Sequence, residues 1–166
     1  MRAETIYLVG FVSAGKSSLA RELGRRLDWR VEDVDDRIEA REHMSVSAIF
    51  SAKGEAHFRA VEREVVRELV GRRHTVVATG GGTFVDPELR ALMKADGAVF
   101  WIDVPFDRII ARLPSDGSRP VASSRAEFER LYELRCLAYA QAHVRLDGSR
   151  ASTGDLADQV VEWLGA

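Results

Sequence analysis

The stretch VGFVSAGKSS, residues 9–18, decides the fold of this chain. It contains the spacing Gly10-x-x-x-x-Gly15-Lys16-Ser17, which is typical of a loop that binds phosphate. In such a loop successive backbone N–H groups surround a polyphosphate, the lysine reaches the outer phosphates, and the serine hydroxyl binds Mg²⁺. The residues expected to contact the nucleotide are Ser13, Ala14, Gly15, Lys16, Ser17 and Ser18.

The segments on either side of the loop favour this interpretation. Residues 5–10, TIYLVG, form an apolar run suited to a buried parallel strand, and residues 16–28 carry leucines at helical spacing. A phosphate-binding loop requires a strand before it and a helix after it. The alternative is an ordinary glycine turn with a solvated lysine, and this context favours nucleotide binding over it.

Strand-like and helix-like segments alternate along the rest of the chain, which predicts an α/β fold with a parallel sheet. Further strands are expected at 29–34, 74–79, 98–103 and 144–147. Further helices are expected at 35–42, at 45–53 with Ser45 as its cap, at 54–70, from Asp86-Pro87 to about 95, at 105–112, at 125–142 and after a cap at Thr153. Residues 113–120, LPSDGSRP, predict an exposed loop.

Composition narrows the class of protein. The chain has 166 residues, 46% of them hydrophobic, which suits a single domain spanning 1–166. A net charge of −2 gives no general attraction to nucleic acid or acidic membranes, and the apolar run 6–12 is too short to span a bilayer. Cys136 is the only cysteine, and the four histidines are scattered rather than spaced as metal ligands. We expect a cytoplasmic protein that binds neither nucleic acid nor membrane.

Two aspartates, Asp33 and Asp35, follow the second expected strand and so lie at its carboxyl end, beside the phosphate loop. If the chain is extended there, alternation points both side chains the same way. Such a pair could hold a metal-bound water and accept a proton from a substrate hydroxyl, two tasks that phosphoryl transfer requires. A solvated acidic turn in which Asp35 caps the next helix explains the same residues equally well.

Arg59 lies among apolar residues of the expected helix 54–70, and Glu62 follows three residues later on the same face. A carboxylate there could hold the guanidinium ready to bind a planar anion by a two-point contact. Taken alone, the pair is explained more simply as a surface ion pair of small energetic weight.

Together these segments closely resemble the shikimate kinase family. The shared segments, in the family's order and spacing from about residue 5 to 164, are GFVSAGKS, DVD, SVSAIFSAKGEAHFRAVE, ATGGG, RP at 119–120 and LYELRCLAY. The GE..FR..E block and the triple glycine are the most specific, because other phosphate-loop kinases lack them. The resemblance implies a three-layer α/β/α P-loop kinase fold with a five-stranded parallel sheet of order 2-3-1-4-5. It also implies a small lid at about 113–124 and substrate-binding helices at about 35–62.

The activity implied by the resemblance is transfer of a phosphoryl group from ATP to the 3-hydroxyl of shikimate, with Mg²⁺, by a monomer. On the nucleotide side, Lys16 and the loop amides would bind the β- and γ-phosphates. Ser17 would ligate Mg²⁺, with Asp33 acting through a coordinated water. The arginines implied in nucleotide binding are Arg112 beside the adenine, Arg119 on the closing lid, and Arg150 near the C-terminal contacts at 150–153.

On the acceptor side, the resemblance implies that Asp35 contacts the hydroxyl that is phosphorylated. Arg59 and Arg135 would hold the shikimate carboxylate. Gly81 would offer its backbone N–H, and its neighbours Gly80 and Gly82 would allow close approach.

Two features depart from the family pattern. His143 stands where a small residue is usual, and the stretch 121–126, VASSRA, is short. The rival interpretations are another small-molecule kinase of this architecture, such as a gluconate or nucleoside kinase, and a non-catalytic module derived from a kinase. The first has no reason to keep both Arg59 and Arg135, and the second would be expected to lose its chemical groups.

Overall fold

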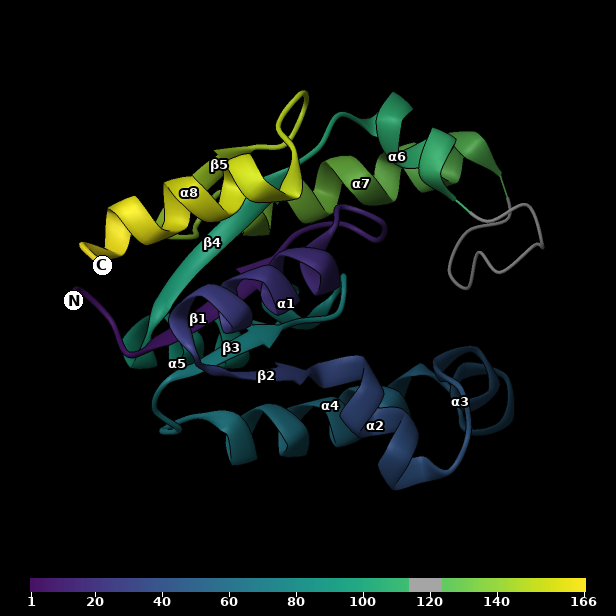
Figure 1. The fold of residues 1–166 in the computed structure, drawn as a ribbon. Helices are drawn as coiled ribbons and strands as arrows, with labels where there is room; N and C mark the ends of the chain where they lie inside the picture. The colour runs from purple at the N-terminus through teal and green to yellow at the C-terminus, as the bar shows by residue number, and fades with distance from the viewer. Residues whose placement is uncertain (114–123) are drawn as a thin grey trace.

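Five parallel strands form the centre of the molecule in the order β2-β3-β1-β4-β5 (Figure 1). The strands are β1 (Thr5–Val9), β2 (Arg30–Asp33), β3 (Thr75–Ala78), β4 (Ala98–Asp103) and β5 (Val144–Asp147). The structure is a computed structural model and describes residues 1–113 and 124–166. Both the predicted α/β class and the implied strand order are confirmed.

The burial of each strand follows from its place in the sheet. β1 lies in the middle, pairs with β3 and β4, and has Ile6 to Val9 completely buried. β2 lies at one edge and carries charged residues, and its Arg30 and Val31 are exposed. A strand covered on both faces needs a continuous apolar sequence, whereas an edge strand tolerates charge.

The helices cover both faces of the sheet (Figure 1). α1 and α8 pack against each other on one face, and α4 and α5 pack together on the other, as right-handed crossovers require. α2 and α3 pack against α4 beyond the β2 edge. The bounds are α1 (Lys16–Leu27), α2 (Val34–Glu42), α3 (Val46–Lys53), α4 (Glu55–Leu69), a 3₁₀ turn η1 (Thr83–Val85), α5 (Pro87–Asp96), α6 (Phe106–Arg112), α7 (Arg125–Tyr139) and α8 (Thr153–Leu164).

Helix ends test the sequence predictions most strictly. The expected caps at Ser45 and Asp86 are confirmed, since each side chain accepts a hydrogen bond from the first turn of its helix. The expected cap at Thr153 is wrong: Ser152 caps α8, in a reciprocal box with Asp155. The predicted helix 125–142 ends at Tyr139, because the chain must turn there before β5 can pair with β4.

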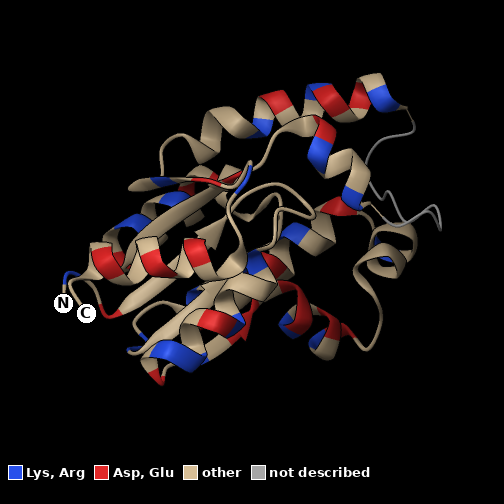
Figure 2. Ribbon diagram, turned by 45° about the horizontal axis from the view of Figure 1, so that its top comes forward, with Lys and Arg blue, Asp and Glu red and all other residues tan. Residues whose placement is uncertain are grey.

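The ends of the sheet differ in character. The carboxyl ends of the strands meet the loop after β1, the start of α2 and the glycine run after β3, whereas the two termini lie together at the opposite end (Figure 1). There the backbone N–H of Arg2 donates to the carbonyl oxygen of Leu164 at 3.0 Å. Acidic and basic residues both occur along α4 and α7, whereas the charged residues of α8 are all acidic (Figure 2). Over the described residues, no helix has the length and apolar character needed to cross a membrane.

Candidate active site

The loop between β1 and α1 has the geometry of a phosphate cradle. Gly10 (φ 152°) and Gly15 (φ 100°) adopt backbone conformations that favour glycine, and a Cβ on Gly10 would lie 2.9 Å from the carbonyl oxygen of Ile102. Lys16 begins α1, and its Nζ donates to the carbonyl oxygens of Gly10 and Phe11 at 2.6 and 2.8 Å. The predicted loop therefore lies between its strand and helix, with the lysine held along it.

Lys16 is buried, with 9% of its surface exposed. This burial lowers the pKa of its ammonium group to about 8; the nearby carboxylate of Asp35 acts in the opposite direction, and the guanidinium of Arg135 lowers the pKa further. Both carbonyl groups that accept from Lys16 are neutral. An anion bound in the loop would therefore gain from a cation that is already desolvated.

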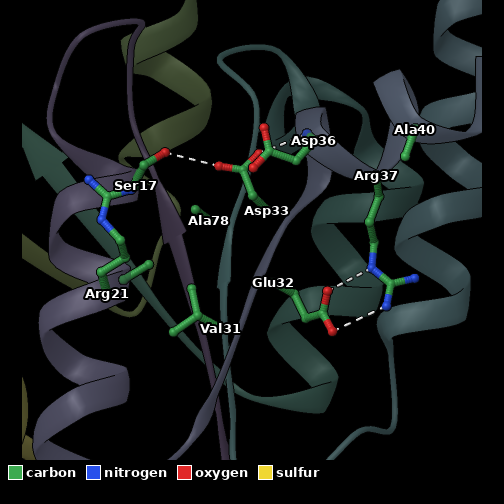
Figure 3. A pocket seen from close by; sticks show the side chains of 10 residues that line it. Ser17, Arg21, Val31, Glu32, Asp33, Asp36, Arg37, Ala40 and Ala78 are labelled. Atoms are coloured by element: carbon green, nitrogen blue, oxygen red, sulfur yellow. Dashed lines mark hydrogen bonds and ion pairs between the residues drawn. The ribbon is translucent and has the colours of Figure 1, made fainter. Parts of the chain in front are cut away.

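Ser17 and Asp33 place two oxygen ligands together at the mouth of the loop (Figure 3). The Ser17 hydroxyl donates to Asp33 Oδ2 at 2.9 Å, while Asp33 Oδ1 accepts from the backbone N–H of Asp36 at 3.1 Å. Asp33 is thus the N-cap of α2, so the alternative in which Asp35 caps this helix is wrong. A hydroxyl beside a carboxylate is a donor set that suits Mg²⁺.

Asp35 lies in the same region, but its backbone conformation differs from the predicted one. α2 begins at Val34, so Asp35 lies in the first helical turn and the expected extended alternation with Asp33 is wrong. Among the described residues, its Oδ1 is the one buried side-chain oxygen without a hydrogen-bond partner. Desolvation raises the pKa of Asp35 to about 6, against the opposing effect of Lys16. The Asp35 carboxylate, which lines both cavities described below, therefore keeps unused capacity to accept a hydrogen bond.

Arg59 and Arg135 point into one cavity from α4 and α7. Arg59 Nη1 donates to Glu62 Oε1 at 2.9 Å, and Glu62 is only 1% exposed, so the simpler surface-pair interpretation is wrong. Burial lowers the pKa of Arg135, and Arg59 contributes to this through charge repulsion. Two guanidinium groups that disfavour each other in a partly buried cavity would be stabilised by a carboxylate between them.

The three glycines after β3 each face one of these side chains. A Cβ on Gly80 would lie 2.7 Å from Asp35 Oδ1, and one on Gly82 would lie 2.5 Å from Arg59 Nη2. A Cβ on Gly81 would lie 3.0 Å from an Arg135 nitrogen. The run therefore lets three charged groups approach the same short piece of backbone.

Two cavities meet at Asp35. One of about 270 Å³ follows the phosphate loop, and one of about 110 Å³ contains both arginines. Their shared lining residues are Val12, Asp35, Gly80 and Gly81. The remaining wall of the smaller cavity is largely apolar and is made by Val46, Phe50, Phe58 and Phe128. Two ligands bound in these cavities would therefore face each other across the Asp35 carboxylate.

The structure places two of the three other arginines predicted to bind the nucleotide. Arg112 Nη1 donates to the carbonyl oxygen of Ser13 at 3.3 Å, which places it against the phosphate loop. Arg150 is exposed on the connection between β5 and α8, at the same end of the sheet. Arg119 and most of the expected lid, 113–124, lie outside the described residues.

Sequence reasoning missed two residues that support the glycine run. The Tyr139 hydroxyl donates to the carbonyl oxygen of Gly81, and the Thr83 hydroxyl accepts from the backbone N–H of Gly80 at 2.9 Å. Tyr139 lies within the segment LYELRCLAY, which carries the resemblance, and Thr83 follows the triple glycine directly. No spacing rule predicts these contacts. His143, which departs from the family pattern, accepts from the backbone N–H of Val99 through Nδ1 at 3.0 Å, away from both cavities.

This five-stranded parallel sheet with a phosphate loop after its first strand and a second cavity beside it defines a small-molecule kinase of the P-loop class. A model of the family described as shikimate kinase matches residues 12–165. The chain belongs to the shikimate kinase family, and the earlier resemblance is confirmed.

Individual relatives are similar to this chain over nearly its full length. A shikimate kinase of Persephonella marina is 36% identical over 157 residues, which cover 94% of this chain and 96% of the relative. A crystal structure of the shikimate kinase from Aquifex aeolicus has a TM-score of 0.87 at 33% identity, covering 97% of this chain and 96% of that one. The Acinetobacter baumannii enzyme in complex with shikimate has a TM-score of 0.89 at 30% identity, covering 97% and 92%.

Proposed function

We infer that the protein transfers the terminal phosphoryl group of ATP to the 3-hydroxyl of shikimate, giving shikimate 3-phosphate and ADP. Membership of the shikimate kinase family supports this activity. The observation that carries the site assignment is the meeting of the two cavities at Asp35. The nucleotide phosphates occupy the cavity along the loop, and shikimate occupies the cavity with the arginines.

The acceptor cavity suits an acid that carries a hydroxyl group. The two guanidinium groups of Arg59 and Arg135 hold the carboxylate, while Asp35 accepts a hydrogen bond from the attacking hydroxyl. The apolar wall covers the ring carbons and keeps water away from the transferred group. Because shikimate carries both its carboxylate and its hydroxyls on one rigid ring, fixing the first orients the second.

On the nucleotide side, Lys16 and the loop amides bind the β- and γ-phosphates. Ser17 would hold Mg²⁺, with Asp33 acting through water, and their adjacent oxygens support this assignment. Bound Mg²⁺ neutralises phosphate charge. Arg112 and Arg150 extend this side of the site beyond the loop, and Arg119 closes onto the transferring phosphate from the lid. We further propose that the enzyme acts as a monomer in the cytoplasm, binding neither nucleic acid nor membrane.

The test is a coupled assay of ADP release with ATP and Mg²⁺, comparing shikimate with gluconate and with a nucleoside monophosphate. We expect release that depends on shikimate and is at background level with the other two. Arg59→Ala and Arg135→Ala should weaken the binding of shikimate far more than the binding of ATP, because both arginines line the smaller cavity. Turnover with gluconate or a nucleotide but not with shikimate would contradict the proposed substrate.

A further inference from the structure

Thr83 lies at the centre of a hydrogen-bond chain beneath the acceptor cavity. It begins η1 directly after the glycine run, and it is completely buried. Its hydroxyl donates to Glu62 Oε2 at 2.8 Å and accepts from the backbone N–H of Gly80 at 2.9 Å. One side chain therefore contacts both the carboxylate that holds Arg59 and the glycine that packs against Asp35.

The direction of these hydrogen bonds is fixed by the number of protons. A threonine hydroxyl has one proton, and an N–H group can only donate, so the Thr83 oxygen must accept from Gly80. Its proton is then available for Glu62 Oε2, while Glu62 Oε1 accepts from Arg59. Each oxygen of this buried carboxylate thus has one donor, and this arrangement holds the plane of the carboxylate and the guanidinium beside it.

We propose that Thr83 is a positioning residue for the acceptor acid, fixing the Arg59 guanidinium through Glu62 and the Asp35 side of the cavity through Gly80. The proposal rests on the proposed function, because the acid it positions is shikimate. Thr83 does not touch the cavity itself, since it is absent from the cavity lining. Without its hydroxyl, Glu62 Oε2 and the Gly80 N–H would both lose a partner in a buried place, and the Glu62 carboxylate that holds Arg59 would be oriented less firmly.

The test compares Thr83→Val, which has the same shape but no hydroxyl, with Thr83→Ser, which keeps the hydroxyl. We expect Thr83→Val to raise the KM for shikimate about tenfold, as loss of one buried hydrogen-bond partner predicts, with the KM for ATP changed by less than about twofold. Thr83→Ser should have a shikimate KM close to that of the wild-type enzyme. Combining Thr83→Val with Arg59→Lys should weaken shikimate by less than the product of the two separate effects, because both act through the same guanidinium.

Thr75→Val is the matched control, because Thr75 is also a buried threonine, but its hydroxyl donates to the carbonyl oxygen of Arg73 at the end of β3 away from the glycine run. It should leave both KM values unchanged. Equal weakening of ATP and shikimate by Thr83→Val, an unchanged shikimate KM, or failure of Thr83→Ser to rescue would each overturn the proposal. If Thr83→Val does not fold, Thr83→Ala provides the same comparison; if neither folds while Thr83→Ser does, Thr83 is structural and the proposal is wrong. A wild-type enzyme that does not bind shikimate would contradict the proposed function instead.

Discussion

At the scale of single residues, burial at the phosphate loop shifts two ionisable groups toward neutral pH. It lowers the pKa of Lys16 to about 8 and raises that of Asp35 to about 6. The two groups attract each other, yet desolvation is the larger cause for both. Because both groups are desolvated, the charge of an arriving ligand would act on them strongly.

The first prediction is a bell-shaped pH dependence of kcat/KM for shikimate. In the proposed mechanism Asp35 must be ionised to accept the hydroxyl proton, so activity should fall as the pH drops through about 6. Lys16 must be charged to bind phosphate, so activity should also fall as the pH rises through about 8. In a pH profile, Lys16→Arg should lose the alkaline limb and the residual activity of Asp35→Asn should lose the acid limb. A wild-type profile that stays flat through pH 6 would contradict the assigned role of Asp35.

The second prediction separates the two aspartates by their response to magnesium. Asp33→Asn removes a carboxylate beside Ser17, so it should raise the Mg²⁺ concentration needed and recover in part when Mg²⁺ is in excess. Asp35→Asn removes the proposed acceptor of the shikimate hydroxyl proton, so it should lower kcat by about 10²- to 10⁴-fold, and excess Mg²⁺ should not restore it. The measurement is a magnesium titration of kcat at saturating ATP and shikimate. Rescue of Asp35→Asn instead would mean that the two roles are reversed.

At the scale of elements, the site depends on how α2, α4 and α7 approach the turn after β3. Each contributes one charged side chain, from Asp35, Arg59 and Arg135, and each side chain lies against a different glycine of the run. Gly82 has an ordinary negative φ, so the missing Cβ matters there rather than backbone conformation. The glycine run therefore determines how closely these helices bring their charges together.

The third prediction is that Gly→Ala substitutions at two positions of this turn change different kinetic constants, the shikimate KM in one case and kcat in the other. Gly82→Ala should raise the shikimate KM about tenfold, because its Cβ displaces the guanidinium of Arg59 and weakens one charged hydrogen bond. Gly80→Ala should mainly lower kcat, because its Cβ displaces the Asp35 carboxylate. Initial-rate kinetics with both substrates would measure both effects.

Gly154→Ala is the control for these two variants. A Cβ there meets its nearest atoms, on Arg26 and Ser152, at the ordinary contact distances of 3.6 and 3.7 Å. It should leave kcat and both KM values unchanged. If Gly82→Ala and Gly80→Ala gave the same pattern of kinetic change, the separate roles of the two glycines would be wrong.

At the scale of the whole molecule, the parallel sheet places the two cavities at the carboxyl ends of its strands and purely structural packing contacts at the amino ends. The loops at the carboxyl ends of the strands carry both cavities, whereas Gly97, which directly precedes β4, lies against Thr5 of β1 at the amino ends of the strands. In doubly wound sheets ligands bind at the carboxyl ends of the strands. Stability can therefore be changed at one end without altering the site at the other.

The fourth prediction uses this separation. Gly97→Ala would place a Cβ 2.4 Å from the backbone oxygen of Thr5, which cannot rotate away. We expect the free energy of unfolding to fall by about 1–3 kcal/mol, as for other overpacked sites. Thermal unfolding should show a lower Tm, while kcat and both KM values measured well below the Tm stay at wild-type levels. A normal Tm, or a selective rise in the shikimate KM, would contradict this division of the molecule.

The sequence by itself determined the class of fold and most of the chemical groups. The phosphate loop is a local motif, in which glycines, lysine and serine act within eight residues, and alternating apolar segments predict strands and helices wherever packing agrees with local preference. For this reason most elements agree with the structure, while the strand order, which the resemblance to the shikimate kinase family implied, agrees as well. The implied roles of Arg119 and Arg150 in nucleotide binding stay predictions.

Only the tertiary structure decided how distant residues meet. It showed that Asp35 lies in a helix, that Glu62 is buried, and that Thr83 joins Glu62 to Gly80. The error at Asp35 arose because a strand passed directly into a helix capped by Asp33, which ends the two-residue alternation of an extended chain. The contacts of Thr83 and Tyr139 depend on side-chain directions across separate elements. Burial and long-range hydrogen bonds are properties of the packed molecule, so no local pattern of residues encodes them.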